Sequence, residues 1–332
     1  MIKSQTENGF LIRVPQTFHG YKVLDIIGCG STSIVTLVED LDTGKRYSAK
    51  IISCIDIEKQ KLTYSIEKEI AILKEVDHPN IIKMKENFNI KNKYNEEFIV
   101  LILEYCENGD LLTLATSNKI KNNFQLKTIL YSFLQSIKYL HSRFISHGDI
   151  KAENILLTSK NVAKLCDFGY CRTTFVAGDD SKNGTLYYAA PELFYTGEFN
   201  PLKTDIYAIG ITLYSISELQ FPFRDGDRNY IVKQIVSGNL SLRPGMDKKL
   251  KNLVLKCTAL DPANRPTIDE ILNDEYFDSC LRKKINSKDN NLGQNSLLIE
   301  KQYSYLSSSS SSQEKSKVSQ QSFDSNEYHL NY

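Results

Sequence analysis

Several residues that could act together on a substrate lie close together in the middle of the chain. Asp149 and Lys151 place a carboxylate and an ammonium group two residues apart, and Asn154 follows three residues later. Asp167 opens the triplet Asp-Phe-Gly shortly after the apolar run 155–157. A carboxylate can orient a hydroxyl group and accept its proton, and carboxylate and amide oxygens suit a hard cation. These residue types therefore suit chemistry on a hydroxyl group assisted by a metal ion.

A second candidate motif is the stretch 28–33, Gly-Cys-Gly-Ser-Thr-Ser, which resembles a glycine-rich phosphate-binding loop. Its two glycines allow the backbone to approach a triphosphate and to point N–H groups at it, although an ordinary turn would look the same in isolation. A dinucleotide-binding loop would open a helix. Residues 34–38, Ile-Val-Thr-Leu-Val, instead read as a strand, so we expect the loop to join two strands of a hairpin.

Lys50 lies in the apolar stretch 47–52, twenty residues beyond Gly30. A lysine within such a strand is costly unless it is paired, although an edge-strand lysine that points to solvent is an equal alternative. Glu69 is an available partner, because it lies in a stretch with apolar residues at helical spacing. A pair of Lys50 and Glu69 could hold the ammonium group on the α- and β-phosphates of a nucleotide.

Together these motifs resemble the eukaryotic protein kinases, because they occur in the order and at the spacing found in that family. The likeness runs from about Tyr21 to Phe277 and favours the serine/threonine type, nearest to the calcium/calmodulin-dependent and AMP-activated kinase group. It implies an α+β, bilobal fold with a small antiparallel sheet lobe and a larger, mostly helical lobe. It also implies transfer of the ATP γ-phosphate, with Mg²⁺, to serine or threonine hydroxyls of protein substrates.

The resemblance assigns a role to each site residue. Asp149 would be the base, Lys151 would neutralise the transferring phosphate, and Asn154 and Asp167 would hold the metal ions. Thr185 would hydrogen-bond Asp149 and Lys151, as in serine/threonine kinases. The implied catalytic residues are Asp149, Lys151, Asn154, Lys50, Glu69 and Thr185. The implied nucleotide-binding residues are Ile27, Gly28, Cys29, Gly30, Ser31, Val35, Lys50, Glu104, Cys106 and Asp110.

Other positions of the resemblance are expected to be structural. Glu192 and Arg265 would form a buried ion pair of the large lobe, which is costly to break. Asp205 would anchor the backbone of the catalytic loop. His147 and Phe168 would pack between the lobes, and a metal site formed by His141 and His147 is a less favoured alternative.

Three positions depart from the family pattern, and the mildest change is Ala152 in place of the usual proline. Ser33 replaces the third glycine of the loop, and Gly148 replaces the arginine that usually precedes the catalytic aspartate. That arginine gathers the phosphate of the activation loop in kinases that have it. Ser181 occupies the usual phosphorylation site, next to Asp179 and Asp180. We therefore predict basal activity without a phosphate switch at Ser181.

The apolar spacing along the chain predicts where the elements lie. Short β-branched and aromatic runs between turn signals indicate an antiparallel sheet over residues 21–101, interrupted by a helix that covers Ile66–Val76. Beyond Glu104 the spacing predicts mainly helices, at 126–140, 205–219, 229–236, 247–258 and 267–273. We expect a loosely held extension at 1–20, a kinase domain at 21–277 with lobes at 21–103 and 107–277, and a disordered tail at 278–332.

The composition excludes several classes of partner. The formal net charge of the 332 residues is +1, which gives no basic field for nucleic acid. No apolar run approaches the ~20 residues that a membrane span needs. The seven cysteines form no CxxC pair, and no secretory signal precedes them, so we expect a reducing compartment, cytoplasmic or nuclear.

Some alternatives stay open. A pseudokinase that acts as a scaffold or allosteric partner is the main rival, supported by Ser33 and Gly148. Tyrosine specificity is disfavoured by Lys151 and Thr185. Autophosphorylation at Ser181 or in the tail, and autoinhibition by the tail, are open. Calmodulin binding is not expected, because the basic run 281–285 is short and lacks aromatic anchors.

Overall fold

The computed structural model describes residues 2–7, 9, 11–30, 32–173, 185–195 and 197–280. Residues 1–282 form one compact unit, and only this unit is considered below. The predictions that concern Ser31, Ser181 and the tail beyond residue 280 lie outside the described residues.

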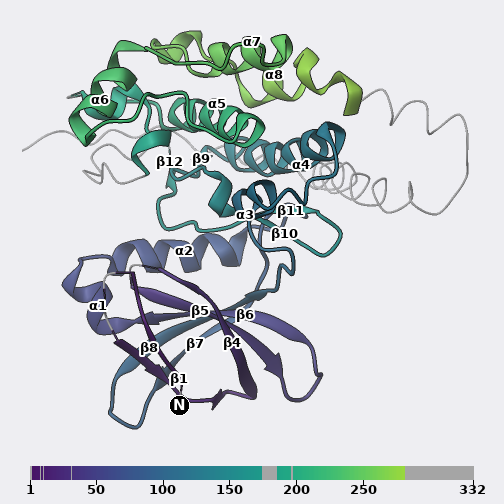
Figure 1. The fold of residues 1–332 in the computed structure, drawn as a ribbon. Helices are drawn as coiled ribbons and strands as arrows, with labels where there is room; N and C mark the ends of the chain where they lie inside the picture. Colours follow the sequence, from purple (N-terminus) through teal and green to yellow (C-terminus); the bar gives the residue numbers. More distant parts are fainter. Residues whose placement is uncertain are drawn as a thin grey trace, which may run out of the picture. The chain divides into compact units, whose positions relative to one another are not determined.

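The small lobe is built on an antiparallel sheet of six strands in the spatial order β3-β4-β5-β6-β8-β7 (Figure 1). Its strands are β3 (Thr17–Phe18), β4 (Tyr21–Cys29), β5 (Ser33–Asp40), β6 (Arg46–Ser53), β7 (Met84–Lys91) and β8 (Glu97–Glu104). Successive side chains of a strand point to opposite faces. In β6 Ile51 joins the apolar cluster on one face, whereas Ile52 joins the larger cluster on the other. Both faces of the sheet are therefore covered.

Two helices follow β6 and belong to the same lobe. The helix α2 (Thr63–Glu75) crosses one face of the sheet and buries Ile66 and Leu73 in the larger apolar cluster. The short helix α1 (Cys54–Lys59) was not predicted from the sequence. It begins where the Ser53 hydroxyl accepts a hydrogen bond from the backbone N–H of Asp56, as an N-cap residue does.

The first residues of the chain form a hairpin of β1 (Ile2–Gln5) and β2 (Leu11–Val14). Ile12 and Val14 are 1% and 0% exposed, and they belong to the same apolar cluster as Ile51. The expectation of a loosely held extension is therefore wrong for these residues. The hairpin covers the face of the sheet that α2 leaves open, and this burial holds it in place.

The large lobe is mainly helical (Figure 1). Its helices are α3 (Leu111–Thr116), α4 (Asn123–His141), α5 (Pro201–Glu218), α6 (Arg228–Ser237), α7 (Lys248–Cys257) and α8 (Ile268–Leu272). Two short strand pairs complete it, β9 (Ile145–Ser146) with β12 (Arg172–Thr173) and β10 (Ile155–Leu157) with β11 (Ala163–Leu165). The helices α4 to α8 lie where the apolar spacing predicts them, whereas α3 was not predicted, and the predicted α+β class is confirmed.

The helix α5 forms the centre of the large lobe. Every residue from Asp205 to Ile216 is buried, so the helix is covered on all sides rather than along one stripe. It packs against α4 and α7 and reaches the strand β9. Residues anchored on α5 are therefore held by the buried core of the lobe.

Among the helices of the described residues, we find none with the length and apolar character to cross a membrane.

Candidate active site

The catalytic-loop stretch 147–154 lies between β9 and β10, and Asp205 of α5 holds its start. The backbone N–H groups of His147 and Gly148 donate to the two oxygens of this carboxylate at 2.8 and 2.9 Å. The ring nitrogen Nε2 of His141 lies 2.9 Å from one of the same oxygens. Asp205 is only 1% exposed, so its partners satisfy a buried charge. The expected contact between Asp205 and the loop backbone is present.

Gly148 has a backbone conformation that explains the missing arginine. Its φ is +81°, a region that residues with a side chain rarely adopt. A Cβ added at this position would also overlap the carbonyl oxygen of Tyr170. The position therefore has no room for a side chain, and nothing in the sequence identified Tyr170 as the residue that closes it.

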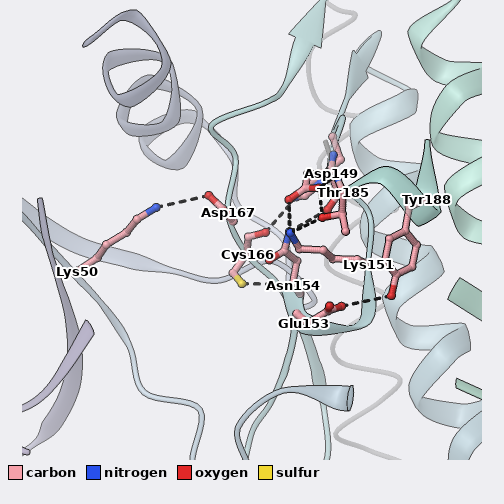
Figure 2. Close-up of polar contacts among 10 residues, drawn as sticks. Lys50, Asp149, Lys151, Glu153, Asn154, Cys166, Asp167, Thr185 and Tyr188 are labelled. Carbon is pink, nitrogen blue, oxygen red and sulfur yellow. Dashed lines mark hydrogen bonds and ion pairs between the residues drawn. The ribbon is translucent and has the colours of Figure 1, made fainter. Parts of the chain in front are cut away.

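Asp149 is the centre of a cluster of polar contacts (Figure 2). The ammonium group of Lys151 lies 2.7 Å from its Oδ2 and donates to the hydroxyl of Thr185 at 3.0 Å. Thr185 in turn donates from its backbone N–H and its hydroxyl to Asp149 Oδ1, both at 3.4 Å. The amide nitrogen of Asn154 donates to the Asp149 carbonyl at 2.8 Å and to Oδ2 at 3.1 Å. Lys151 and Asn154 of the same stretch, together with Thr185 from a separate segment, therefore contact one carboxylate.

The electrostatics of the cluster keep Lys151 charged. Burial alone would lower the pKa of its ammonium group, but the Asp149 carboxylate, helped by Asp167 and Glu153, outweighs burial and raises the pKa. A charged ammonium group beside Asp149 can neutralise a phosphoryl group that approaches the same carboxylate.

Lys50, Glu69 and Asp167 form a second cluster. The Lys50 ammonium donates to both carboxylate oxygens of Glu69 at 2.7 and 2.9 Å and to Oδ1 of Asp167 at 3.4 Å. Burial would lower the pKa of Lys50, but the two carboxylates outweigh it and raise the pKa. The nearby ammonium group is also the main reason that the pKa of Asp167 is lowered. The alternative of a solvent-facing Lys50 is therefore wrong.

Ser65 was not identified by the sequence, although it contacts the same region. Its hydroxyl donates to the backbone carbonyl of Gly169 at 2.5 Å. This links α2 directly to the Asp-Phe-Gly triplet. A serine near a helix start carries no spacing signal for such a contact.

Asn154 and Asp167 fit the metal role that the resemblance implies. Both offer oxygen ligands, which a hard divalent cation prefers. The amide nitrogen of Asn154 is used by Asp149, so its oxygen is the atom that can bind a cation. The Asp167 carboxylate is ionised at neutral pH because its pKa is lowered.

The glycine-rich loop joins β4 to β5, as the sequence predicts. Gly28 lies opposite Val35 in the antiparallel ladder. Ile27 precedes Gly28 in β4 and is 43% exposed. The N–H of Gly30 donates to the Ser33 carbonyl at 2.8 Å and closes the loop. Cys29, the last residue of β4, is exposed.

The predicted nucleotide-binding residues Glu104, Cys106 and Asp110 lie at the end of β8 and just after it. The Glu104 carboxylate pairs with Lys164 at 2.8 Å, and its carbonyl accepts a hydrogen bond from the Ser48 hydroxyl at 3.1 Å. Cys106 is 7% exposed, and its carbonyl accepts from the N–H of Gly109. The Asp110 carboxylate caps α3. Contacts of these three residues with a nucleotide stay predictions.

A cavity of ≈ 120 Å³ adjoins Asp149. Leu186, Ala189 and Phe194 contribute to its lining. Tyr188 also lines it, and its hydroxyl donates to the Glu153 carboxylate at 3.3 Å. The Asp149 carboxylate therefore borders a space with mixed polar and apolar walls, in which a peptide side chain could lie.

Glu192 and Arg265 form the expected ion pair of the large lobe. Two nitrogens of the guanidinium group donate to the two carboxylate oxygens at 2.6 and 2.7 Å. The Arg265 side chain is 0% exposed and also donates to the backbone carbonyls of Lys203 and Ala259. Its role is structural, because it fixes the segment that carries Thr185 onto the α7–α8 region.

His147 and Phe168 also pack as expected. Their rings meet edge to face with centroids 5.3 Å apart, and both side chains are fully buried. A hydrogen bond of 3.0 Å between Nε2 of His147 and the backbone carbonyl of Cys166 holds the histidine ring in place. This arrangement leaves the histidine in a packing role.

Comparison with known proteins agrees with this geometry. Residues 21–277 match the family that is described as "protein kinase domain". The chain is 32% identical over 258 residues to a probable serine/threonine-protein kinase of Dictyostelium discoideum, which covers 76% of this chain and 30% of that protein. It is 31% identical over 269 residues to serine/threonine-protein kinase Nek1 of Mus musculus. This match covers 79% of this chain and 22% of that protein.

A third relative is serine/threonine-protein kinase kin-29 of Caenorhabditis elegans, 30% identical over 261 residues, with 77% of this chain and 31% of that protein covered. The chain thus spans between about a fifth and a third of the length of these relatives. The family is shared by all of them, whereas the kinase subgroup stays a prediction. With the matched domain covering most of its length, this chain belongs to the protein kinase family.

Proposed function

We propose that this chain transfers the γ-phosphate of ATP to serine or threonine hydroxyls of protein substrates, with Mg²⁺ as the divalent cation and Asp149 as the base. Membership of the family implies ATP, a divalent cation and protein substrates in general. The observation that carries the proposal is the convergence of Lys151, Thr185 and Asn154 on the Asp149 carboxylate.

Phosphoryl transfer requires positioning and charge neutralisation rather than covalent work by the protein. A bound Mg²⁺ supplies positive charge beside the phosphates, and the oxygens of Asn154 and Asp167 would hold it. Lys50, fixed by Glu69, would contact the α- and β-phosphates. Asp149 would orient the substrate hydroxyl and accept its proton. Lys151 would neutralise the phosphoryl group in transfer.

Serine/threonine specificity is supported by the pair of Lys151 and Thr185. The Lys151 ammonium spans the distance between Asp149 and Thr185, and so it occupies the space beside the base. A serine or threonine acceptor has a short side chain, so the peptide backbone of the substrate lies close to this pair when the hydroxyl reaches Asp149. A tyrosine hydroxyl would hold the peptide backbone several ångströms farther away.

A basic residue on the N-terminal side of the acceptor is a further part of the proposal. Glu153 and Asp110 are the acidic residues that would recognise it. Glu153 is half-buried and accepts a hydrogen bond from Tyr188, which fixes its carboxylate next to the cavity beside Asp149. A peptide array that shows no preference for a basic residue on the N-terminal side of the acceptor would contradict this part of the proposal.

We also propose that activity does not require a phosphate on Ser181. The support is Gly148, because the backbone at this position leaves no room for a phosphate-gathering arginine. Ser181→Ala is expected to retain the wild-type rate. A large gain of activity on phosphorylation of Ser181, lost in Ser181→Ala, would contradict this.

The remaining expectations are proposals of the same kind. A cytoplasmic or nuclear location is supported by the cysteines from Cys29 to Cys280, all of which are free thiols. Autophosphorylation and the absence of calmodulin binding concern segments outside the described residues, and they rest on the sequence alone.

The acceptor specificity can be tested with three peptides that differ only at the acceptor. The purified 332-residue chain, Mg·ATP and a basic peptide with serine, threonine or tyrosine at one position are combined, and phosphate transfer is followed by mass spectrometry. Transfer to serine and threonine with little to tyrosine is expected. Preferred transfer to tyrosine would contradict the assignment of Lys151 and Thr185.

A further inference from the structure

The turn of the β1–β2 hairpin reaches the glycine-rich loop. The backbone N–H of Glu7 donates to the carbonyl of Gly30 at 2.9 Å. The hydroxyl of Ser4 lies 3.5 Å from the Cys29 sulfur. Thr6, between them, is 4% exposed, whereas the side chain of Glu7 is exposed. The backbone of this turn therefore lies against the loop, and the Glu7 side chain takes no part in the contact.

The other end of the hairpin is fixed to the sheet. Ile12 and Val14 are buried in the apolar cluster of the sheet face opposite α2. The backbone carbonyl of Arg13 accepts a hydrogen bond from the Asn92 side chain at 2.8 Å. The guanidinium group of Arg13 pairs with Glu96 at 3.3 Å. The hairpin thus connects a rigid anchor at the β7–β8 turn to the tip of the loop.

This connection restrains a segment that is intrinsically flexible. Glycine has more backbone freedom than any other residue, and a glycine-rich loop loses that freedom when it closes over phosphates. The N–H of Gly30 donates a hydrogen bond to the Ser33 carbonyl inside the loop. The carbonyl of Gly30 accepts a hydrogen bond from the N–H of Glu7 outside the loop. A loop held from outside before the nucleotide arrives loses less entropy on binding.

We propose that the strands β1 and β2, together with Thr6 and Glu7, form a strap that positions the glycine-rich loop over the nucleotide, with the backbone N–H of Glu7 as the positioning donor. The strap precedes the matched kinase region 21–277, so it is an addition to the common domain. The inference rests on the proposed function only in that a nucleotide binds beneath the loop. It predicts a role in nucleotide affinity and none in peptide recognition.

The decisive comparison is Glu7→Pro with Glu7→Ala in the full chain. Proline removes the N–H that contacts Gly30, whereas alanine retains it and changes only an exposed side chain. The dissociation constant of Mg·ADP is measured by calorimetry. One lost hydrogen bond predicts an increase of roughly threefold to tenfold for Glu7→Pro and none for Glu7→Ala.

A second variant guards against local misfolding by proline. Deletion of residues 2–10 removes β1 and the turn but keeps the buried anchors Ile12 and Val14 of β2. It is expected to raise the Kd of Mg·ADP, and the KM of ATP, by a similar factor. The thermal midpoint is expected to fall somewhat, because β1 and the buried Thr6 are lost, whereas the KM of the peptide is expected to stay unchanged.

Either of two results would overturn the strap. Glu7→Pro and Glu7→Ala could bind Mg·ADP equally well, or the deleted chain could bind it as tightly as the wild type. Failure of the proposed function is distinguishable, because a chain that binds Mg·ADP without transferring phosphate still reports on the strap.

Discussion

The hydroxyl of Ser65 donates a hydrogen bond of 2.5 Å to the backbone carbonyl of Gly169. Ser65 and Glu69 are four residues apart in α2 and therefore lie on the same face of the helix. Glu69 holds Lys50, and Lys50 contacts Asp167, which opens the triplet that Gly169 closes. The helix α2 thus contacts the triplet twice, once directly and once through an ion-paired lysine.

Loss of the direct contact should lower activity without abolishing it. Ser65→Ala removes one hydrogen bond with a net value of ~1 kcal/mol, which corresponds to an approximately fivefold lower kcat on a serine peptide. Ser65→Thr keeps the hydroxyl and is the matched control. Equal rates for Ser65→Ala and wild type, or an equal fall in both variants, would show that this contact does not matter for turnover.

Introducing a side chain at Gly148 should be costly. Gly148→Ala places a Cβ at φ +81° against the Tyr170 carbonyl, and a loss of ~3 kcal/mol of unfolding free energy is expected. Gly44 is the matched control, because its φ is +67° and no atom lies within 4 Å of an added Cβ. Gly44→Ala should cost only the backbone strain, ~1 kcal/mol. Urea unfolding measures both, and equal losses would refute the role of Tyr170.

The Arg265–Glu192 pair should dominate the stability of the large lobe. Arg265→Met leaves a largely buried carboxylate without its partner, which costs ~3–5 kcal/mol of unfolding free energy. Lys91→Met breaks an ion pair of 2.6 Å whose side chains are 58% and 52% exposed, and it should cost less than ~1 kcal/mol. Similar losses in the two variants, measured by urea unfolding, would contradict the structural role of Arg265.

Cys29 and Cys106, both among the predicted nucleotide-binding residues, should react with iodoacetamide at different rates and with a different dependence on pH. Burial raises the pKa of the Cys106 thiol to about 12, and the thiolate is the reactive form. A raised pKa favours the thiol, so Cys106 should stay unmodified by iodoacetamide at pH 7.5 and react only as the pH approaches that value. Exposed Cys29 should react first.

Peptide mass spectrometry follows both sites in the same sample, and unfolding in urea serves as the control that exposes Cys106. Modification of Cys106 as fast as Cys29 in the folded chain at pH 7.5 would contradict the burial of this thiol.

The sequence predicted most of the fold and the contacts between motifs. Lys50 could be paired with Glu69 because a lysine in an apolar strand needs a partner and because Glu69 shares a helix with periodic apolar residues. Thr185 lies against Asp149 and Lys151, where the resemblance placed it. The catalytic and binding roles of these residues stay predictions.

Other features could not be predicted, for physical reasons. The contact between Ser65 and Gly169 joins a side chain to a backbone carbonyl, and such a contact leaves no pattern in residue types. The β1–β2 hairpin looked like a polar extension, because Ile12 and Val14 are the only buried apolar side chains among its described residues. Its order depends on the uncovered sheet face, which is a property of the folded lobe.

The base assigned to Asp149 is the central claim, and one variant tests it. Asp149→Asn keeps the shape of the side chain but cannot accept a proton. Transfer of the γ-phosphate from Mg·ATP to a basic serine/threonine peptide pool should fall by at least ~100-fold, while Mg·ADP still binds. Transfer at the wild-type rate by Asp149→Asn would contradict the account. So would a wild-type chain that binds Mg·ADP but transfers nothing, a result that would favour a pseudokinase scaffold.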